Sequence, residues 1–271
     1  MNPVARVLVI AASDSGGGAG IQADIKTIAA FGGYATTAIT AVTAQNTLGV
    51  AGVHAVPTEL VALQIRLVLE DIGADAIKTG MLVDGPTIEA VAEALAESKV
   101  PLVLDPVMVA KGGRRLLDAS AIERLRALLI PRARLLTPNL PEAEALTGMS
   151  IDDRVGMQRA AESLCRDGAR AVLIKGGHLA GATVHDLLLM DGNAEWFSAP
   201  RIESSAGHGT GCTLASAIAV GLAQGTGLVE AVREAREYVR AGLGRGLAVG
   251  AGHRPLDHGA DKGAGAAWGR R

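Results

Sequence analysis

The chain alternates between short apolar runs and amphipathic segments, and this alternation constrains the fold more than any other feature. Runs such as RVLVIAA (residues 6–12) and PLVLDP (101–106) lack polar alternation, which is typical of strands buried on both faces. Between such runs lie segments with apolar residues at helical spacing, such as ELVALQIRLVLEDIG (59–73). Strands separated by helices predict a three-layer α/β/α sandwich with a central, mostly parallel sheet.

The organisation of the chain favours one domain. Its 271 residues, 49% of them hydrophobic, suffice for a sizeable core, and no internal repeat or linker interrupts residues 1–258. Residues 183–190 and 194–200 predict a late hairpin, and the last third is expected to be helical from Gly211 to about Leu247. Residues 259–271 have little to pack, so we expect a mobile tail.

Charge and composition exclude several classes of partner. Lys and Arg number 26 against 28 for Asp and Glu, and aromatic residues make up only 2%, which argues against nucleic acid and anionic membrane partners. No apolar run reaches the roughly 18–20 residues of a membrane span, and the N-terminus has no signal-peptide pattern. Two cysteines, Cys165 and Cys212, make no disulfide framework. We therefore expect a cytoplasmic protein.

Ligands of parallel α/β proteins bind beyond the carboxyl ends of the strands. Polar or glycine-rich segments follow the predicted strands at residues 13–20, 43–49, 79–81, 105–113, 137–142 and 176–178. These segments are therefore the predicted location of the site.

The segment GHGTGC (207–212) precedes an apolar, Ala-rich run that reads as a helix. A glycine-rich turn at a helix start gathers backbone N–H groups around one point, which suits an anion such as phosphate. The alternative is an ordinary loop with a glycine-eased helix start. It is not a Walker A loop, because no Lys-Ser or Lys-Thr follows the last glycine.

Cys212 ends this turn. A thiol at a helix N-terminus is expected to have a lowered pKa, which would suit a base or a nucleophile. The alternative is a small buried hydrophobic residue, and that is the interpretation we give to Cys165, on the apolar face of a predicted helix.

The loop after the first strand, SDSGGGAGIQAD (13–24), contains a match to the dinucleotide-binding fingerprint at residues 18–23. That fingerprint expects an acidic residue about 20 positions further on, but none occurs between Asp24 and Glu59. A nicotinamide-dependent oxidoreductase is therefore disfavoured, and a loop touching a small polar ligand is the better interpretation. Gln45, with two donors and an acceptor, suits the edge of a heterocycle, or else stabilises a turn.

Charged residues follow three further strands. Asn139 and Glu142 have the spacing of a helix capping box, and an acidic helix start could also hold hydrated Mg²⁺ beside phosphates. Asp105 ends a buried strand and is either a loop acceptor or a metal or substrate contact. Lys175 precedes a Gly-Gly turn, where its charge suits a phosphate. The six histidines lack the spacing of a zinc site, and we interpret them as structural or loop residues.

Seven motifs carry a resemblance to a known family. The chain contains, in order, SDSGGGAGIQADIKT, TAVTAQNTLGV, IKTGML, LDPVMVAKGG, LTPNLPEAEALTG, LIKGGHL and HGTGCTLASAIA. From about Val7 to His258 it resembles the hydroxymethylpyrimidine/phosphomethylpyrimidine kinases of thiamine biosynthesis, which are ribokinase-like. Departures are small: Arg254 stands where a glycine is usual, Ala12 stands where many members have glycine, and SSAG precedes the turn where relatives often have Asn-Thr.

The resemblance implies two successive phosphoryl transfers from ATP, with Mg²⁺, first to the hydroxymethyl group of 4-amino-5-hydroxymethyl-2-methylpyrimidine and then to its monophosphate. Most ribokinase-like enzymes have a catalytic aspartate where this chain and the pyrimidine kinases have cysteine. The roles implied are catalysis by Gly209, Thr210, Gly211 and Cys212; substrate binding by Gln45, Gly20, Asp24, Met81 and Val107; nucleotide binding by Lys175 and Asn139; and metal binding by Glu142 and Asp105.

Two alternative functions remain open. The first is a pyridoxal or pyridoxine kinase of the same superfamily, although Gln45 and the full motif of the loop at residues 13–24 favour a pyrimidine substrate. A non-catalytic pyrimidine-binding protein is the second alternative, but it would leave Lys175, Glu142 and the glycine-rich turn at residues 207–212 without a function. A homodimer is a possible assembly.

Overall fold

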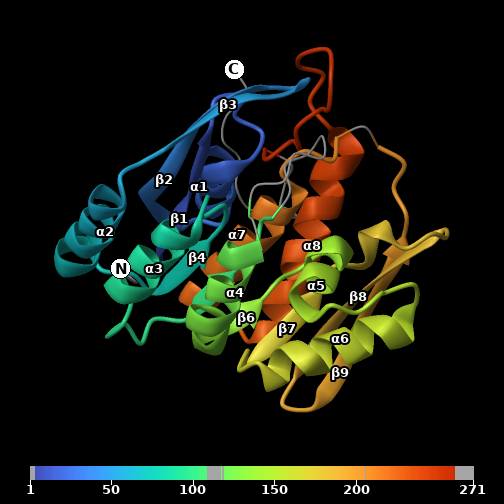
Figure 1. Ribbon diagram of the computed structural model, residues 1–271. Helices are drawn as coiled ribbons and strands as arrows, with labels where there is room; N and C mark the ends of the chain where they lie inside the picture. The colour runs from blue at the N-terminus through green and yellow to red at the C-terminus, as the bar shows by residue number, and fades with distance from the viewer. Residues whose placement is uncertain (1–3, 109–116, 118, 205, 260–271) are drawn as a thin grey trace.

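The computed structural model describes residues 4–108, 117, 119–204 and 206–259. Within them, nine strands form one sheet in the order β3-β2-β1-β4-β5-β6-β7-β8-β9 (Figure 1). The strands are β1 (Arg6–Asp14), β2 (Tyr34–Asn46), β3 (Gly49–Ala55), β4 (Ala76–Thr79), β5 (Leu102–Leu104), β6 (Ala133–Leu136), β7 (Ala171–Ile174), β8 (Thr183–Met190) and β9 (Asn193–Pro200).

The centre of the sheet, from β2 through β1, β4, β5 and β6 to β7, is parallel. β3 pairs antiparallel with β2 at one edge, and β8 and β9 form an antiparallel hairpin at the other. The mostly parallel sheet and the late hairpin are thus confirmed. β3 was not predicted, because its sequence GVAGVHA contains two glycines and no continuous apolar run.

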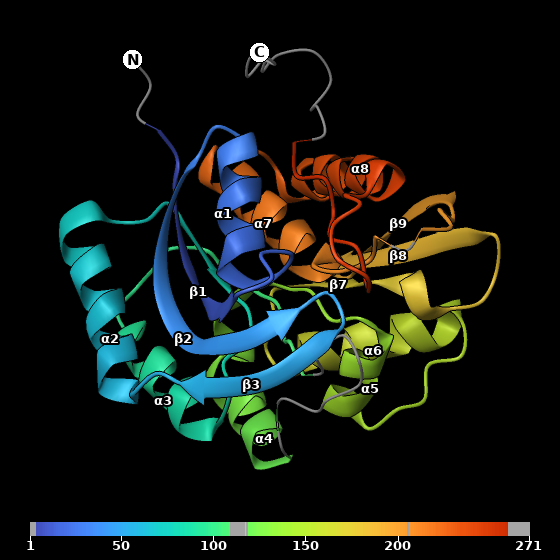
Figure 2. The same ribbon diagram turned by 90° about the horizontal axis from the view of Figure 1, so that it is seen from above.

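Helices cover both faces of the sheet and make the three layers expected (Figure 2). The described helices are α1 (Gly20–Ala30), α2 (Thr58–Leu67), α3 (Gly85–Ala94), α4 (Ala119–Leu128), α5 (Leu140–Thr147), α6 (Arg154–Arg166), α7 (Thr210–Ala223) and α8 (Leu228–Arg245). One apolar core lies between the sheet and α2 to α6, and a second lies between the sheet and α1, α7 and α8.

Local sequence explains several helix ends. The Asp84 side chain accepts a hydrogen bond from the backbone N–H of Thr87, 2.9 Å away, and so caps α3. The helix predicted over residues 59–73 ends at Leu67 and continues as a π-helical turn to Ile72. The helical stretch predicted from Gly211 to about Leu247 is two helices, because Gly225, with a φ of 82°, turns the chain between α7 and α8.

The parallel strands end at a common edge of the sheet, and α7 begins at the same edge. α7 is buried along most of its length between the sheet and its neighbours α1 and α8. A helix that is apolar nearly all round is one that lies inside a protein. Its N-terminus therefore points out of the core at the place where strand-end residues gather. Among the described helices, none is long and apolar enough to cross a membrane.

Candidate active site

A cavity of about 420 Å³ lies at this edge, beyond the carboxyl ends of the parallel strands. It brings together nearly all of the site residues predicted from the sequence. Those that line it are Gly20, Gln45, Met81, Asp105, Val107, Asn139, Glu142, Lys175, Gly209, Thr210, Gly211 and Cys212. Residues almost 200 positions apart in the chain therefore meet around one space.

The start of α7 forms one wall of this cavity. Gly209 caps the helix with a φ of 82°, and a Cβ at this position would lie 1.9 Å from the carbonyl oxygen of Gly18. Only glycine fits this conformation and this approach. The first turn of a helix leaves its backbone N–H groups without helical acceptors, so the turn from Gly209 to Cys212 presents donors and the positive end of the dipole to the cavity.

A cluster of charges faces this turn. Lys175 Nζ lies 2.9 Å from Asp105 Oδ1 and 3.8 Å from Glu142 Oε2, and Thr137 Oγ1 donates to the same Asp105 oxygen at 3.0 Å. Gly211 lies against the cluster, since a Cβ there would be 3.3 Å from Lys175 Nζ. Burial would lower the pKa of Lys175, but the carboxylates of Asp105 and Glu142 raise it above its usual value. The Lys175 ammonium therefore stays charged beside the turn from Gly209 to Cys212, which we call the anion turn.

The capping box predicted for α5 is present. Glu142 Oε2 accepts from the backbone N–H of Asn139 at 2.8 Å, and Asn139 Oδ1 accepts from the backbone N–H of Glu142 at 2.9 Å. Glu142 also belongs to the charged cluster, so its structural role and a ligand-facing role are compatible. Burial raises the pKa of Glu142 to about 7, against the opposing charge of Lys175.

Cys212 differs from its prediction. Its pKa is raised to about 11, chiefly by burial, although Lys78 acts to lower it and the backbone N–H of Gly20 hydrogen-bonds the sulfur. The expectation of a lowered pKa was wrong, because loss of hydration at this packed helix start outweighs the helix dipole. Cys165 is half-buried against the core, as expected.

Asp24 lies outside the cavity lining, unlike the other predicted substrate contacts. It is fully buried on α1, where it faces β4: Lys78 Nζ donates to its two oxygens at 2.9 and 3.0 Å, and Ser216 Oγ donates at 2.7 Å. Burial would lower the pKa of Lys78, but the Asp24 carboxylate raises it. A sealed ion pair thus lies close enough to Cys212 to act on its pKa.

A second cavity, of about 440 Å³, adjoins the first. It extends over β8, residues 201–204 and α8, and it shares Asn139, Lys175, His178, Gly207, Thr210 and Gly211 with the first cavity. Lys175 and the anion turn therefore stand where the two spaces meet.

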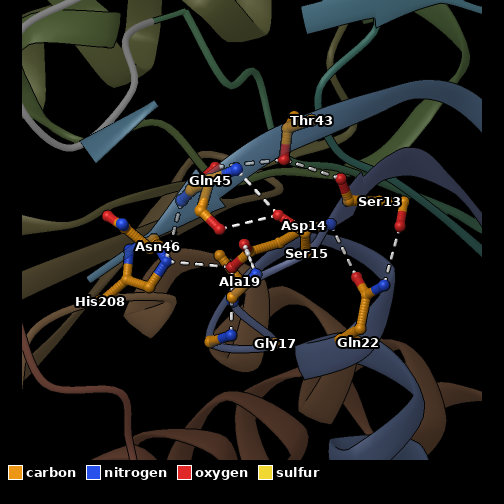
Figure 3. A network of polar contacts seen from close by, with 12 residues as sticks. Ser13, Asp14, Ser15, Gly17, Ala19, Gln22, Thr43, Gln45, Asn46 and His208 are labelled. Carbon is orange, nitrogen blue, oxygen red and sulfur yellow. Dashed lines mark hydrogen bonds and ion pairs between the residues drawn. The ribbon is translucent and has the colours of Figure 1, made fainter. Parts of the chain in front are cut away.

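Sequence reasoning missed the network around Gln45 (Figure 3). The Gln45 side chain lies 3.1 Å from His208 Nε2, and the same nitrogen lies 3.1 Å from Asp14 Oδ2. Asp14 in turn accepts from the backbone N–H groups of Gly16, Gly18 and Ala19 at 2.8 to 3.0 Å. The signal available was that His208 lies inside the glycine turn itself, yet we interpreted all six histidines as structural or loop residues.

Among the described residues, no group of three or more His, Cys, Asp and Glu side chains could hold a metal ion on its own. Mg²⁺, however, keeps several waters and is commonly held by one or two carboxylates together with substrate phosphates. Asp105 and Glu142 offer two carboxylates on the wall of the cavity. The donors present therefore fit a hydrated Mg²⁺ that arrives with a phosphate ligand.

Comparison with known proteins identifies the family to which the chain is related. Residues 14–257 match the family model described as phosphomethylpyrimidine kinase. A hydroxymethylpyrimidine/phosphomethylpyrimidine kinase of Streptomyces coelicolor is 51% identical over 254 residues, which cover 93% of this chain and 94% of the relative.

Two solved structures are also similar. A phosphomethylpyrimidine kinase of Clostridium difficile is 41% identical, with a TM-score of 0.78 that covers 87% of this chain and 98% of its own. A pyridoxal kinase of Staphylococcus aureus in complex with AMP-PCP and pyridoxal is 33% identical, with a TM-score of 0.88 and coverage of 96% and 95%. The family match over nearly all of the sequence, together with relatives above 40% identity, shows that this chain belongs to the phosphomethylpyrimidine kinase family.

Proposed function

We propose that this chain transfers the γ-phosphoryl group of ATP to the hydroxymethyl group of 4-amino-5-hydroxymethyl-2-methylpyrimidine, and then a second phosphoryl group to the monophosphate. The product is the diphosphate used in thiamine biosynthesis. The observation that carries the proposal is the pair of adjoining cavities that share Lys175 and the turn from Gly209 to Gly211. Two substrates that must exchange a phosphoryl group need two spaces with a cationic, donor-rich junction.

The cavity lined by Gln45, Met81 and Val107 takes the pyrimidine. Gln45 provides hydrogen bonds to the heterocycle edge, and the apolar side chains of Met81 and Val107 contact its faces. The adjoining cavity, which shares Lys175 and the turn from Gly209 to Gly211, takes the nucleotide. That the similar pyridoxal kinase was solved with AMP-PCP supports nucleotide binding by this fold.

At the junction, the backbone N–H groups of Gly209–Cys212 and the Lys175 ammonium hold the transferring phosphoryl group and stabilise its charge. The substrate hydroxyl attacks the γ-phosphorus as its proton passes to the Cys212 thiolate. The bond from the γ-phosphorus to the β–γ bridging oxygen breaks, and ADP leaves. Asp105 and Glu142 are the side chains that would hold a hydrated Mg²⁺ bound with the nucleotide, where it would neutralise charge on the phosphates.

The second transfer uses the same junction with a different nucleophile. A phosphate monoester is largely ionised near pH 7, because its second pKa is about 6. Its oxygen therefore attacks without first losing a proton to Cys212. One site can thus perform both transfers, with the base needed chiefly in the first.

Phosphorus NMR after incubation of the protein with the pyrimidine alcohol and Mg-ATP tests the proposal. The expected result is a monophosphate signal that is later replaced by the two signals of the diphosphate. ADP formation without either phosphorylated pyrimidine would contradict the proposal.

Pyridoxal is a second candidate substrate, since a pyridoxal kinase shares the fold with a TM-score of 0.88. The higher identity to the Streptomyces coelicolor pyrimidine kinase favours the pyrimidine. The same assay with pyridoxal and pyridoxine in place of the alcohol compares the substrates directly. We expect the larger kcat/KM for the pyrimidine.

A further inference from the structure

The network in Figure 3 contains two conflicts that have one common solution. Both involve the amide at the end of the Gln45 side chain. The Gln45 backbone is fixed independently, because its N–H donates to Ser15 Oγ at 2.8 Å and its carbonyl accepts from the same hydroxyl at 2.7 Å. Only the orientation of the amide is therefore open.

The first conflict lies at His208. Asp14 accepts from three backbone N–H groups, and its side chain is 4% exposed. Burial alone would raise the pKa of Asp14, but hydrogen bonds from His208 and from the backbone of Ala19 and Gly16 hold it below its usual value. Asp14 is thus a carboxylate that can only accept. His208 Nε2, 3.1 Å away, must therefore carry a hydrogen and donate it.

His208 Nε2–H is a donor, and the Gln45 amide nitrogen that lies 3.1 Å from it is also a donor. Two donors therefore face each other.

The second conflict lies at Thr43. Its hydroxyl has one hydrogen, yet it faces two acceptors, the carbonyl oxygen of Ser13 at 3.0 Å and Gln45 Oε1 at 3.5 Å. In this orientation the Thr43 hydrogen satisfies Ser13 and leaves Gln45 Oε1 without a good donor, while the contact at His208 sets donor against donor.

A half-turn of the Gln45 amide exchanges its oxygen and nitrogen, which removes the donor–donor contact at His208 and leaves the Thr43 hydrogen with one acceptor. Gln45 Oε1 then faces His208 Nε2–H and shares that single hydrogen with Asp14 Oδ2 in a three-centre hydrogen bond. Gln45 Nε2 donates one hydrogen to Thr43 Oγ1, whose own hydrogen stays with Ser13. The second N–H of Gln45 is left for a ligand in the cavity that Gln45 lines.

We propose that His208, held by Asp14, is a positioning residue that turns the Gln45 amide so that its N–H group faces the substrate. The site then selects a heterocycle that presents a hydrogen-bond acceptor, such as a ring nitrogen, at this position. The imidazole is itself well held: its side chain is 12% exposed, and a Cβ on Gly18 would lie 2.5 Å from its Cδ2. This inference rests on the proposed pyrimidine-binding role of Gln45.

The test uses two variants of matched length. His208→Gln keeps an N–H donor near the position of the imidazole Nε2, whereas His208→Met has a similar shape and no donor. Calorimetry measures the dissociation constant of the pyrimidine alcohol and, separately, of AMP-PCP. We expect His208→Met to weaken pyrimidine binding by about 5- to 10-fold, His208→Gln to stay within about threefold of the parent protein, and AMP-PCP binding to be unchanged in both.

The double variant separates positioning from a general disturbance of the turn. If His208 acts through Gln45, Gln45→Ala/His208→Met binds the pyrimidine no more weakly than Gln45→Ala alone. An analogue with the ring nitrogen replaced by C–H should bind more weakly than the alcohol to the parent protein, and this discrimination should shrink in His208→Met. A structural role alone would not change this ratio.

Three results would overturn the inference. His208→Met could leave pyrimidine affinity unchanged. The loss of pyrimidine affinity in His208→Met could add to the loss in Gln45→Ala. It could also be accompanied by an equal loss of AMP-PCP affinity, which would show a distorted turn. In these cases a large effect of Gln45→Ala would leave the proposed function standing. If Gln45→Ala itself had no effect, both the role of Gln45 and the inference would fall.

Discussion

Two lysine–carboxylate pairs act on the same turn at the start of α7, and they differ in what surrounds them. Lys78 and Asp24 are sealed, with side chains that are 0% exposed and with Ser216 as a further donor. Lys175 and Asp105 have the same separation, 2.9 Å. Lys175 is 16% exposed, Asp105 is 2% exposed, and both side chains line the cavity.

The difference in surroundings indicates which pair is available for chemistry. A sealed pair can only balance its own charges, and breaking it strands a charge in the core. In a pair on a cavity wall, each charged group can replace part of its contact with the other by a contact with a ligand. We therefore assign a structural role to the Lys78–Asp24 pair near Cys212. We assign the Lys175–Asp105 pair to contact with the phosphoryl groups.

The largest effect is expected from Lys78→Met, which breaks the sealed pair. The uncompensated Asp24 carboxylate should cost about 3–5 kcal/mol of unfolding free energy, measured by urea denaturation. The matched control is Lys78→Met/Asp24→Asn, which removes both charges and should recover much of the loss. A single variant as stable as the parent protein would show that the pair is not a structural unit.

Lys175→Met should give the opposite pattern. Loss of one preorganised donor at a transferring phosphoryl group typically costs about 10²–10³ in rate, so kcat/KM should fall by this factor. Stability should fall less than in Lys78→Met, because Asp105, although 2% exposed, retains the hydrogen bond from Thr137 and borders the cavity. A variant that unfolds easily yet keeps its specific activity would reverse the assignment of the two pairs.

The sequence predicted the fold well where patterns are local, as in the buried strands and the capping box of α5. It could not reveal the burial of Lys78 against Asp24, a residue 54 positions away. It misjudged the Cys212 pKa because the burial that raises this pKa depends on tertiary packing, which no local pattern reveals. The homodimer and the single-domain boundary at residue 258 stay predictions, and the tail beyond Gly259 lies outside the described residues.

Glu142→Gln should have a smaller effect. Glutamine keeps the capping oxygen at the third position of α5 but removes a negative charge from the cavity wall, so about 10-fold more Mg²⁺ should be needed for half-maximal activity. Activity titrated with Mg²⁺, beside a thermal melt, measures both roles. A large fall in Tm with an unchanged Mg²⁺ requirement would leave Glu142 with the capping role alone.

The smallest effect is expected at an exposed pair that shares the chemistry but not the burial. Arg126 and Asp167 lie 2.8 Å apart, with side chains 42% and 26% exposed. Arg126→Gln should change the unfolding free energy by less than about 1 kcal/mol and leave both phosphoryl transfers unchanged. A loss as large as that of Lys78→Met would mean that burial does not distinguish these pairs.

The central claim is that the turn between the two pairs is the transfer site and that Cys212 accepts the proton there. The most direct measurement is the rate of each transfer against pH in the parent protein and in Cys212→Ala, starting from the alcohol or from the monophosphate. With a pKa of about 11, the thiolate is scarce at pH 7 and its fraction grows as pH rises. The first transfer should therefore accelerate with pH in the parent protein. In Cys212→Ala it should lose this rise and slow by about 10²–10⁴-fold, while the second transfer should suffer much less. Equal losses in both transfers would contradict the account, because Cys212 would then only shape the turn, and no loss in either would reduce it to a packing residue.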